Sequence, residues 1–143
     1  MRKVGATLRL PALTAAAMSL ALAACVSSPQ HLTCRPGERL SVQDTLYFGT
    51  AWARGPVTAH DWSKFVQLSV TPRFPQGFTV SKATGQWRGA DGTIAHESTY
   101  VLSVIHPDDT PSEAAIAEIV ASYKSAFQQE SVLRSRAETC ASF

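Results

Sequence analysis

Two β-prone runs separated by a glycine-rich turn give the clearest pattern in the sequence. Residues 78–88 and 94–106 are rich in β-branched and apolar side chains, and residues 89–92 have the Gly-Ala-Asp-Gly composition of a tight turn. A three-residue loop that ends in glycine sets Val80 opposite Leu102. Slipping the pairing by one residue would match the apolar positions less well, so the hydrophobic pattern selects this register.

A first helix is predicted from residue 58 onward. The Thr58 hydroxyl can cap a helix, and Asp61 follows three residues later, where its negative charge favours a helix N-terminus. Pro72 ends the helix within a residue or two. One face of this helix is expected to carry Trp62, Phe65, Val66 and Ser69.

The second helix has the stronger local signal. Thr110 is the predicted N-cap, Pro111 takes the first helical position, and Glu113 completes a capping box. Apolar residues then recur at helical spacing and predict a single stripe that packs into the core. The members of this stripe are Ile116, Ile119, Val120, Tyr123 and Phe127.

The order of the predicted elements is β-α-β-β-α-β. The first strand lies within residues 40–50, and the fourth is predicted over residues 131–136. This order predicts an α+β fold of the ferredoxin-like, split β-α-β type, with an antiparallel sheet of spatial order 4-1-3-2. Right-handed crossovers put both helices on one face of that sheet.

The third predicted strand raises the question of what covers the other face. Its residues 100–105 are apolar at both parities of the strand alternation. Since the two helices cover one face only, we expect the other to meet a partner subunit, the N-terminal segment or a ligand. A homodimer that packs sheet against sheet is the partner we favour.

The first residues have the pattern of an export signal. A basic start with Arg2, Lys3 and Arg9 precedes an apolar run over residues 10–22. This run is shorter than the roughly 20 residues that a transmembrane helix needs. It ends in Leu-Ala-Ala-Cys at residues 22–25, which resembles the lipobox of bacterial lipoprotein signal peptides.

The lipobox resemblance implies that residues 1–24 are a signal peptide and that Cys25 becomes the lipid-carrying first residue, anchored to a membrane. Residue 26 is valine rather than the aspartate that marks inner-membrane retention. If the host is Gram-negative, we therefore expect an outer-membrane lipoprotein that faces the periplasm. A secreted protein without lipid is the alternative. Residues 25–33 would form a polar tether, and residues 34–143 the folded domain.

Loss of the leader changes the charge and the cysteine count. The chain has 13 Lys and Arg and 11 Asp and Glu, and three of the basic residues lie in the leader, so the remainder carries a net charge of −1. Without a basic cluster, nucleic-acid binding is not expected. Cys34 and Cys140 remain after lipidation of Cys25, and in an oxidising compartment this pair predicts a disulfide. The predicted sheet supports it, because the fourth strand ends beside the start of the first.

Four short motifs carry a resemblance to a known family. They are Leu-Tyr-Phe-Gly at 46–49, Thr-Pro-Arg-Phe-Pro at 71–75 with Gly77, Gly-Gln-Trp-Arg at 85–88, and Gln-Glu-Ser-Val at 129–132. Together they resemble the bacterial family catalogued as domain of unknown function 3574. The resemblance implies a small exported or lipid-anchored protein and supports the fold and the compartment. It implies no activity.

Candidate chemistry is sparse. Gln86 and His96 are directly opposite in the predicted hairpin, and with Arg88 and Arg73 they form a candidate site for a small anion, because arginine offers the planar donor fork that carboxylates and phosphates need. The alternative is a solvated hairpin end, with Arg73 paired to an acid such as Glu97 or Glu130. The histidines lack metal-ligand spacing. No nucleophile motif or phosphate-binding glycine loop is present, so we expect no metal and no cofactor.

Three functions remain open. The first is a non-enzymatic module of the cell envelope that binds a partner or itself through the uncovered sheet face, and this is the function we favour. The second is a binder of a small anionic ligand. The third is an enzyme of the dimeric ferredoxin-like barrel type, for which Tyr47, Tyr100 or His106 is the candidate polar residue on the sheet.

Overall fold

The computed structural model describes residues 32–52 and 54–142. The predicted signal peptide, Cys25 and most of the predicted tether lie outside the described residues. The elements, in chain order, are β1 (Arg39–Gly49), α1 (Ala59–Phe65), the π-helix η1 (Val66–Val70), β2 (Thr79–Arg88), β3 (Ile94–His106), α2 (Thr110–Phe127) and β4 (Leu133–Ala141).

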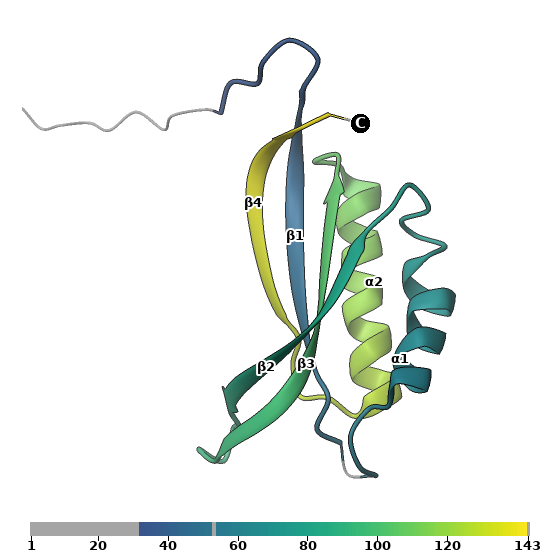
Figure 1. The fold of residues 1–143 in the computed structure, drawn as a ribbon, viewed down its shortest axis with the longest axis vertical. Helices are drawn as coiled ribbons and strands as arrows, with labels where there is room; N and C mark the ends of the chain where they lie inside the picture. The colour runs from purple at the N-terminus through teal and green to yellow at the C-terminus, as the bar shows by residue number, and fades with distance from the viewer. Residues whose placement is uncertain (1–31, 53, 143) are drawn as a thin grey trace, which may run out of the picture. The chain divides into compact units, whose positions relative to one another are not determined.

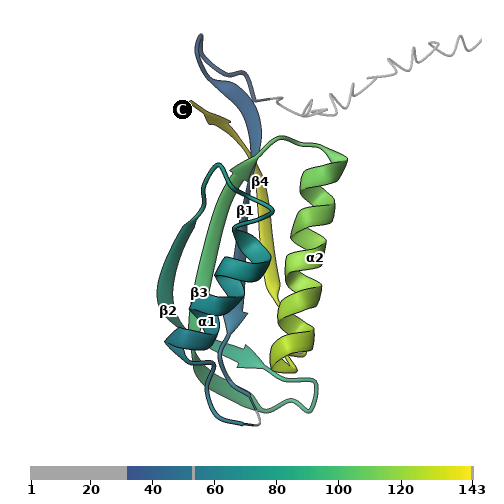
Figure 2. The ribbon, with the colours of Figure 1, turned by 90° about the vertical axis from the view of Figure 1, so that its right-hand side faces the viewer.

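The four strands form one antiparallel sheet in the order β2-β3-β1-β4. Both helices lie on the same face of this sheet, α1 beside α2 (Figures 1 and 2). The predicted ferredoxin-like α+β fold and its strand order are therefore confirmed. Among the described helices, none is long and apolar enough to cross a membrane.

The hairpin between β2 and β3 has the predicted register. Val80 is opposite Leu102, and the Gly89 N–H donates to the Thr93 carbonyl oxygen at 2.9 Å. Gly92 has a φ of +84°, a backbone conformation that residues with a Cβ rarely adopt. The hydrophobic pattern was sufficient here because a slip of one residue would turn every side chain of the strand to the other face.

The first helical segment begins at the predicted cap and ends at Val70, within two residues of Pro72 as predicted, but its last part is a π-helix. The Thr58 hydroxyl accepts from the Asp61 N–H at 3.2 Å, while the Asp61 carboxylate accepts from the Thr58 N–H at 3.1 Å, which forms a capping box. The chain then widens into the π-helix η1, whose end is marked by a hydrogen bond from Thr71 N–H to the Val66 carbonyl at 2.9 Å. Periodicity alone did not predict this change of pitch before Pro72.

The cap of helix α2 differs from the prediction by one residue. Asp109 is the N-cap, and its carboxylate accepts from the Ser112 N–H at 2.8 Å. The prediction that Thr110 is the N-cap was wrong, because Thr110 is already helical. The Asp109 carboxylate instead accepts from a free N–H of the first turn, and its negative charge favours the helix N-terminus. Glu113 does not close a capping box, since its carboxylate binds Arg134 from β4 instead.

The core lies between the helices and the even-numbered residues of β1 and β3. Four members of the predicted α2 stripe are buried, and Val120 packs against them. The indole of Trp62 stacks on the ring of Tyr100 with 4.4 Å between centroids. The buried hydroxyl of Tyr123 donates to the Gly49 carbonyl at 2.8 Å, which satisfies a polar group that would otherwise be costly to bury.

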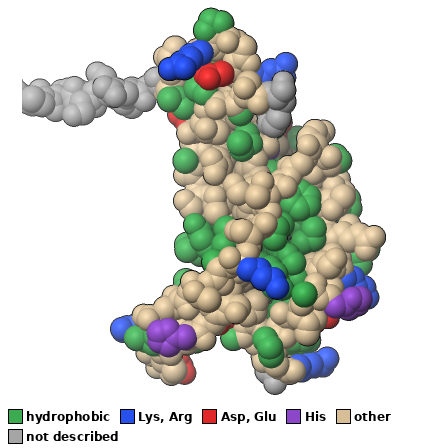
Figure 3. All heavy atoms as spheres, in the orientation of Figure 1, with side chains coloured by type: hydrophobic (Ala, Val, Ile, Leu, Met, Phe, Trp, Pro, Cys, Tyr) green, Lys and Arg blue, Asp and Glu red, His purple; other side chains and the backbone are tan. Residues whose placement is uncertain are grey.

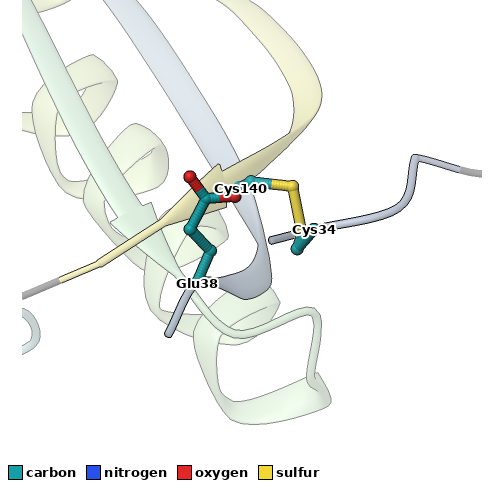
Figure 4. A group of neighbouring side chains, drawn as sticks. All are labelled: Cys34, Glu38 and Cys140. Atoms are coloured by element: carbon teal, nitrogen blue, oxygen red, sulfur yellow. A yellow bond between two sulfur atoms is a disulfide. The ribbon is translucent and has the colours of Figure 1, made fainter. Parts of the chain in front are cut away.

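Strand β4 is longer than predicted and closes the domain. It pairs with β1 as far as Ala141, which is opposite Arg39, so the two ends of the domain meet at one edge of the sheet. There Cys34 and Cys140 form the predicted disulfide, with 5.4 Å between their Cα atoms (Figure 4). In the chain-entropy model, a crosslink that closes about 100 residues is worth roughly 4.7 kcal/mol.

A buried polar network joins four elements on the helix side of the sheet. Asp44 of β1 is fully buried, and its carboxylate accepts from Arg134 Nε at 2.7 Å and from Arg134 Nη2 at 2.7 Å. His106 Nε2 of β3 lies 2.8 Å from the same carboxylate, and His106 Nδ1 lies 2.7 Å from the Pro107 carbonyl. The other side of the Arg134 guanidinium binds Glu113 of α2.

Asp44 has a lowered pKa as a result of this network. Burial by itself raises the pKa of Asp44, but the hydrogen bonds from Arg134 and His106 outweigh it and bring the pKa below its ordinary value of 3.8. Because the folded pKa is below the unfolded one, Asp44 stabilises the fold above the unfolded pKa. That contribution is lost as the pH falls through the folded pKa.

We therefore expect Asp44→Asn to lower the free energy of unfolding by about 3–5 kcal/mol at pH 7, because it breaks a buried ion pair and leaves Arg134 with only the half-exposed Glu113 as a partner. The variant should also lose part of the acid-induced fall in stability. Urea unfolding followed by circular dichroism between pH 3 and 7 measures both effects. The control is Asp108→Asn, whose exposed pair with Arg136 is worth at most about 1 kcal/mol. An Asp44→Asn protein as stable as this control would contradict the prediction.

Candidate functional site

The face of the sheet opposite the helices is not covered by any element of the described chain. Odd-numbered strand residues point to this face, which we call the open face. Most are small or hydroxylic. Four larger apolar side chains stand among them with at least a third of their surface exposed: Tyr47, Trp87, Ile105 and Leu133.

One end of the open face is bent into a projecting arm. Strand β1 ends at Gly49, which is opposite Thr99, so residues 85–97 form a hairpin of β2 and β3 alone. We call residues 85–97 the arm. It leaves the sheet and projects away from the helices at the lower left of Figure 1, and its outline is visible in Figure 3. The strand-length mismatch thus makes this end of the open face concave.

A hollow of about 560 Å³ occupies this concavity, within the roughly 300–1,000 Å³ that is usual for ligand pockets. Its walls come from three segments distant in sequence: the arm, the end of β1, and the connection from α2 to β4. Side chains that line it include Tyr47, Trp87, Asp91, Glu97, Gln129, Glu130 and Leu133. Three of the four sequence motifs, 46–49, 85–88 and 129–132, meet here.

Glu97 is held in place at the base of the arm. Its carboxylate accepts from the Ala51 N–H at 2.7 Å, and the side chain is half-buried. Gly49 makes room for it, since a Cβ at Gly49 would lie 2.6 Å from Glu97 Oε1. Gln129 donates to the Ala51 carbonyl and so ties the third wall to the same loop. Glu97 is therefore a positioned carboxylate at the edge of the hollow.

The charge of the hollow is negative. Asp91, Glu97 and Glu130 are among its lining residues, and in the described part of the chain no Lys, Arg or His lines it. Hydrogen bonds from the N–H and hydroxyl of Thr93 lower the pKa of Asp91 below its ordinary value, so this carboxylate is ionised at neutral pH. The aromatic side chains of Tyr47 and Trp87, 38% and 42% exposed, offer flat apolar surface beside these charges.

The residues of the predicted anion site are only partly brought together. Gln86 and His96 are opposite each other as predicted, and Arg88 follows two residues along on the same face of the arm. Arg73 lies beyond the other end of β2. Its Nη2 is 2.8 Å from Glu118 Oε2 of α2, and its Nη1 donates to the Ser69 carbonyl at 2.7 Å.

The predicted pairing of Arg73 with Glu97 or Glu130 was wrong, because both of those acids lie at the hollow. Of the three residues proposed for an enzyme, only Tyr47 lines the hollow, whereas Tyr100 and His106 are buried on the helix side. Of the residues predicted for the anion site, Gln86 lines the hollow and Arg73, Arg88 and His96 are not among its lining residues. Sequence reasoning did not find the rest of the hollow. The signal that could have found it was the set of motifs, three of which converge there.

A possible metal ligand set lies at the other end of the sheet. Within the described part of the chain, Cys34, Glu38 and Cys140 are the group whose donor atoms lie within 4.8 Å of one another (Figure 4). Both sulfurs are joined in the disulfide, so neither is a free thiolate, the form of cysteine that binds metals.

Comparisons with known proteins identify the family of the chain and the fold that it shares. The model described as "Protein of unknown function (DUF3574)" matches residues 43–143. No curated protein matches the chain. A solved structure of a phage SAM lyase in complex with S-methyl-5'-thioadenosine has a TM-score of 0.55 and 13% identity, and covers 82% of this chain and 97% of that one. An apo phage SAM lyase has a TM-score of 0.52 and 15% identity, with 79% and 97% covered. These two likenesses show a shared fold.

Proposed function

Since the chain belongs to the DUF3574 family, whose function is unknown, we propose a function from the geometry: the domain is a non-enzymatic module that binds a small organic ligand in the hollow of its open face. One observation carries this proposal. Three motif-bearing segments that are far apart in sequence meet around a single concave site. A merely solvated hairpin end would not need walls from β1 and from the α2–β4 connection.

The contacts around the hollow support a site that is built before the ligand arrives. The backbone of Ala51, just after β1, donates to Glu97 of the arm and accepts from Gln129 of the third wall, so all three walls are coupled through this residue. Preorganisation of this kind lowers the entropy that a ligand must lose from the protein on binding. The aromatic side chains of Tyr47 and Trp87 provide apolar contact area.

The first experiment locates a ligand by NMR. The purified protein is titrated with a panel of nucleosides, amino acids, polyamines and quaternary amines that includes SAM and S-methyl-5'-thioadenosine. We expect at least one member to give saturable shifts at the Trp87 indole and at the amides of Gly85 and Glu97. Trp87→Ala should weaken that binding about tenfold, since base or aromatic stacking is worth roughly 1–3 kcal/mol.

His96→Gln is the matched control, because His96 is on the same arm but is not among the residues that line the hollow. It should leave the affinity unchanged. The proposal fails if no panel member binds, or if binding maps to another surface. Conversion of SAM to S-methyl-5'-thioadenosine during the titration would instead favour an enzyme, since both structural neighbours are SAM lyases.

We also propose that the module is tethered to a membrane through Cys25. The lipobox-like sequence at residues 22–25 supports this location, as does the disulfide, which is typical of oxidising compartments. Mass spectrometry of membrane-extracted protein should find a chain that begins at an acylated Cys25. Cys25→Ser should release the protein from the membrane fraction. A chain that still begins at Met1 would contradict the anchor.

Self-association through the open face is the second candidate, favoured by the exposed apolar side chains of Tyr47, Ile105 and Leu133. We expect the protein to sediment as a dimer at micromolar concentration, and Ile105→Asp to shift it to a monomer. Val80→Asp is the control, because Val80 has nearly the same exposure, 37% against 38%, but points to the helix side. A monomeric wild-type protein, or equal effects of both substitutions, would contradict this interface.

A further inference from the structure

We propose that the ligand of the hollow is an organic cation whose charge is carried by an alkylated sulfur or nitrogen, a sulfonium or a quaternary ammonium group. This inference rests on the proposed binding function and specifies the ligand class. Three features of the hollow support it: the sign of its charge, its aromatic surface and its size.

The sign of the charge follows from the lining residues. Asp91, Glu97 and Glu130 bring negative charge to one concavity, and within residues 32–52 and 54–142 no Lys, Arg or His lines it to neutralise that charge. Arg88 and His96, the residues of the arm with basic side chains, are on the opposite face of its strands. A concave, partly apolar site of one sign attracts a ligand of the other sign. An anion, the ligand of the second function that the sequence left open, would be repelled here.

The aromatic surface favours a weakly hydrated cation. Tyr47 and Trp87 both line the hollow, and the faces of such rings attract quaternary ammonium and similar ions through their negative quadrupole. Ala95 and Leu133 add apolar wall beside them. An alkylated cation loses little hydration against such a wall, whereas a primary ammonium group or a metal ion would lose much more.

The size of the hollow and the spread of its acids argue against a metal ion. A calcium or magnesium ion needs about six or more oxygen ligands within roughly 2.0–2.6 Å. In the described residues, the carboxylates of the hollow do not form a group with donor atoms within 4.8 Å of one another. A volume of about 560 Å³ instead fits an extended organic molecule, and the acidic side chains are distributed along the walls of the hollow.

Two pairs of probes separate charge from shape. SAM and S-adenosylhomocysteine differ by one methyl group and one positive charge on sulfur. Choline and 3,3-dimethylbutan-1-ol differ by the charge of the quaternary centre at nearly constant shape. Isothermal titration calorimetry of the purified protein measures all four. We expect the cation of at least one pair to bind about tenfold more tightly than its neutral partner, with the preference falling as salt increases. The pair that shows the preference identifies the source, a sulfonium nucleoside or a quaternary amine.

Two substitutions test the role of Glu97. Glu97→Gln keeps an oxygen acceptor for the Ala51 N–H and removes the charge, so it should reduce the cation preference severalfold. Gly49→Ala keeps every charge but puts a methyl group 2.6 Å from the position of Glu97 Oε1, so it should displace the carboxylate and weaken cation binding as well. His96→Gln should change neither measurement. Thermal unfolding confirms that each variant is folded.

The outcomes distinguish this inference from the function on which it rests. Equal binding of cation and neutral partner in both pairs overturns the cation inference while ligand binding stands. A neutral or anionic panel member that binds while all the cations fail overturns it in the same way. No binding by any probe or panel member overturns the proposed function itself. A cation preference that Glu97→Gln leaves intact overturns the part assigned to Glu97.

Discussion

The interaction of Arg134 with two carboxylates holds the layers of this domain in place. Its guanidinium lies between Asp44, buried on the central strand β1, and Glu113 on the first turn of α2. His106 contacts Asp44 from β3, so one cluster joins three strands to a helix. A buried carboxylate without these partners would cost several kcal/mol. The position of α2 over the sheet, and of β4 at its edge, is therefore linked to one charged contact.

The same network explains how β4 is placed on the sheet and why the two ends of the domain meet. Arg134 enters from the first part of β4, and the pairing with β1 continues from there to the disulfide at Cys140. Electrostatic contacts thus secure one end of this edge strand and a covalent bond secures the other. Disulfides are typical of oxidising compartments, the setting that we propose from the lipobox-like residues 22–25.

The concave shape of the open face follows from a difference in length between strands β1 and β3. Strand β3 has 13 residues and continues beyond the end of β1, so the hairpin with β2 leaves the plane of the sheet as the arm. A two-stranded ribbon is at best marginally stable alone, and the contact between Glu97 and Ala51 fastens its base to the domain. This design combines a rigid body, carried by the aromatic core around Phe48 and Tyr123, with an exposed concave site.

Local pattern by itself determined the four strands, the two α-helices, the β2–β3 register, the α2 stripe and the strand order. Each of these follows from which side chains alternate or recur along a short stretch. The π-helix η1 does not, and it was not predicted. Local pattern also determined the disulfide, since the topology brings Cys34 beside Cys140. It missed contacts between residues far apart in sequence: the pairing of Arg73 with Glu118, and the burial of Asp44 beneath Arg134. The hollow was missed for the same reason, because its walls come from segments that are far apart in sequence. Pattern says which face of a strand is buried, but only the tertiary structure decides which charges share a cavity, because that depends on where separate segments end in space.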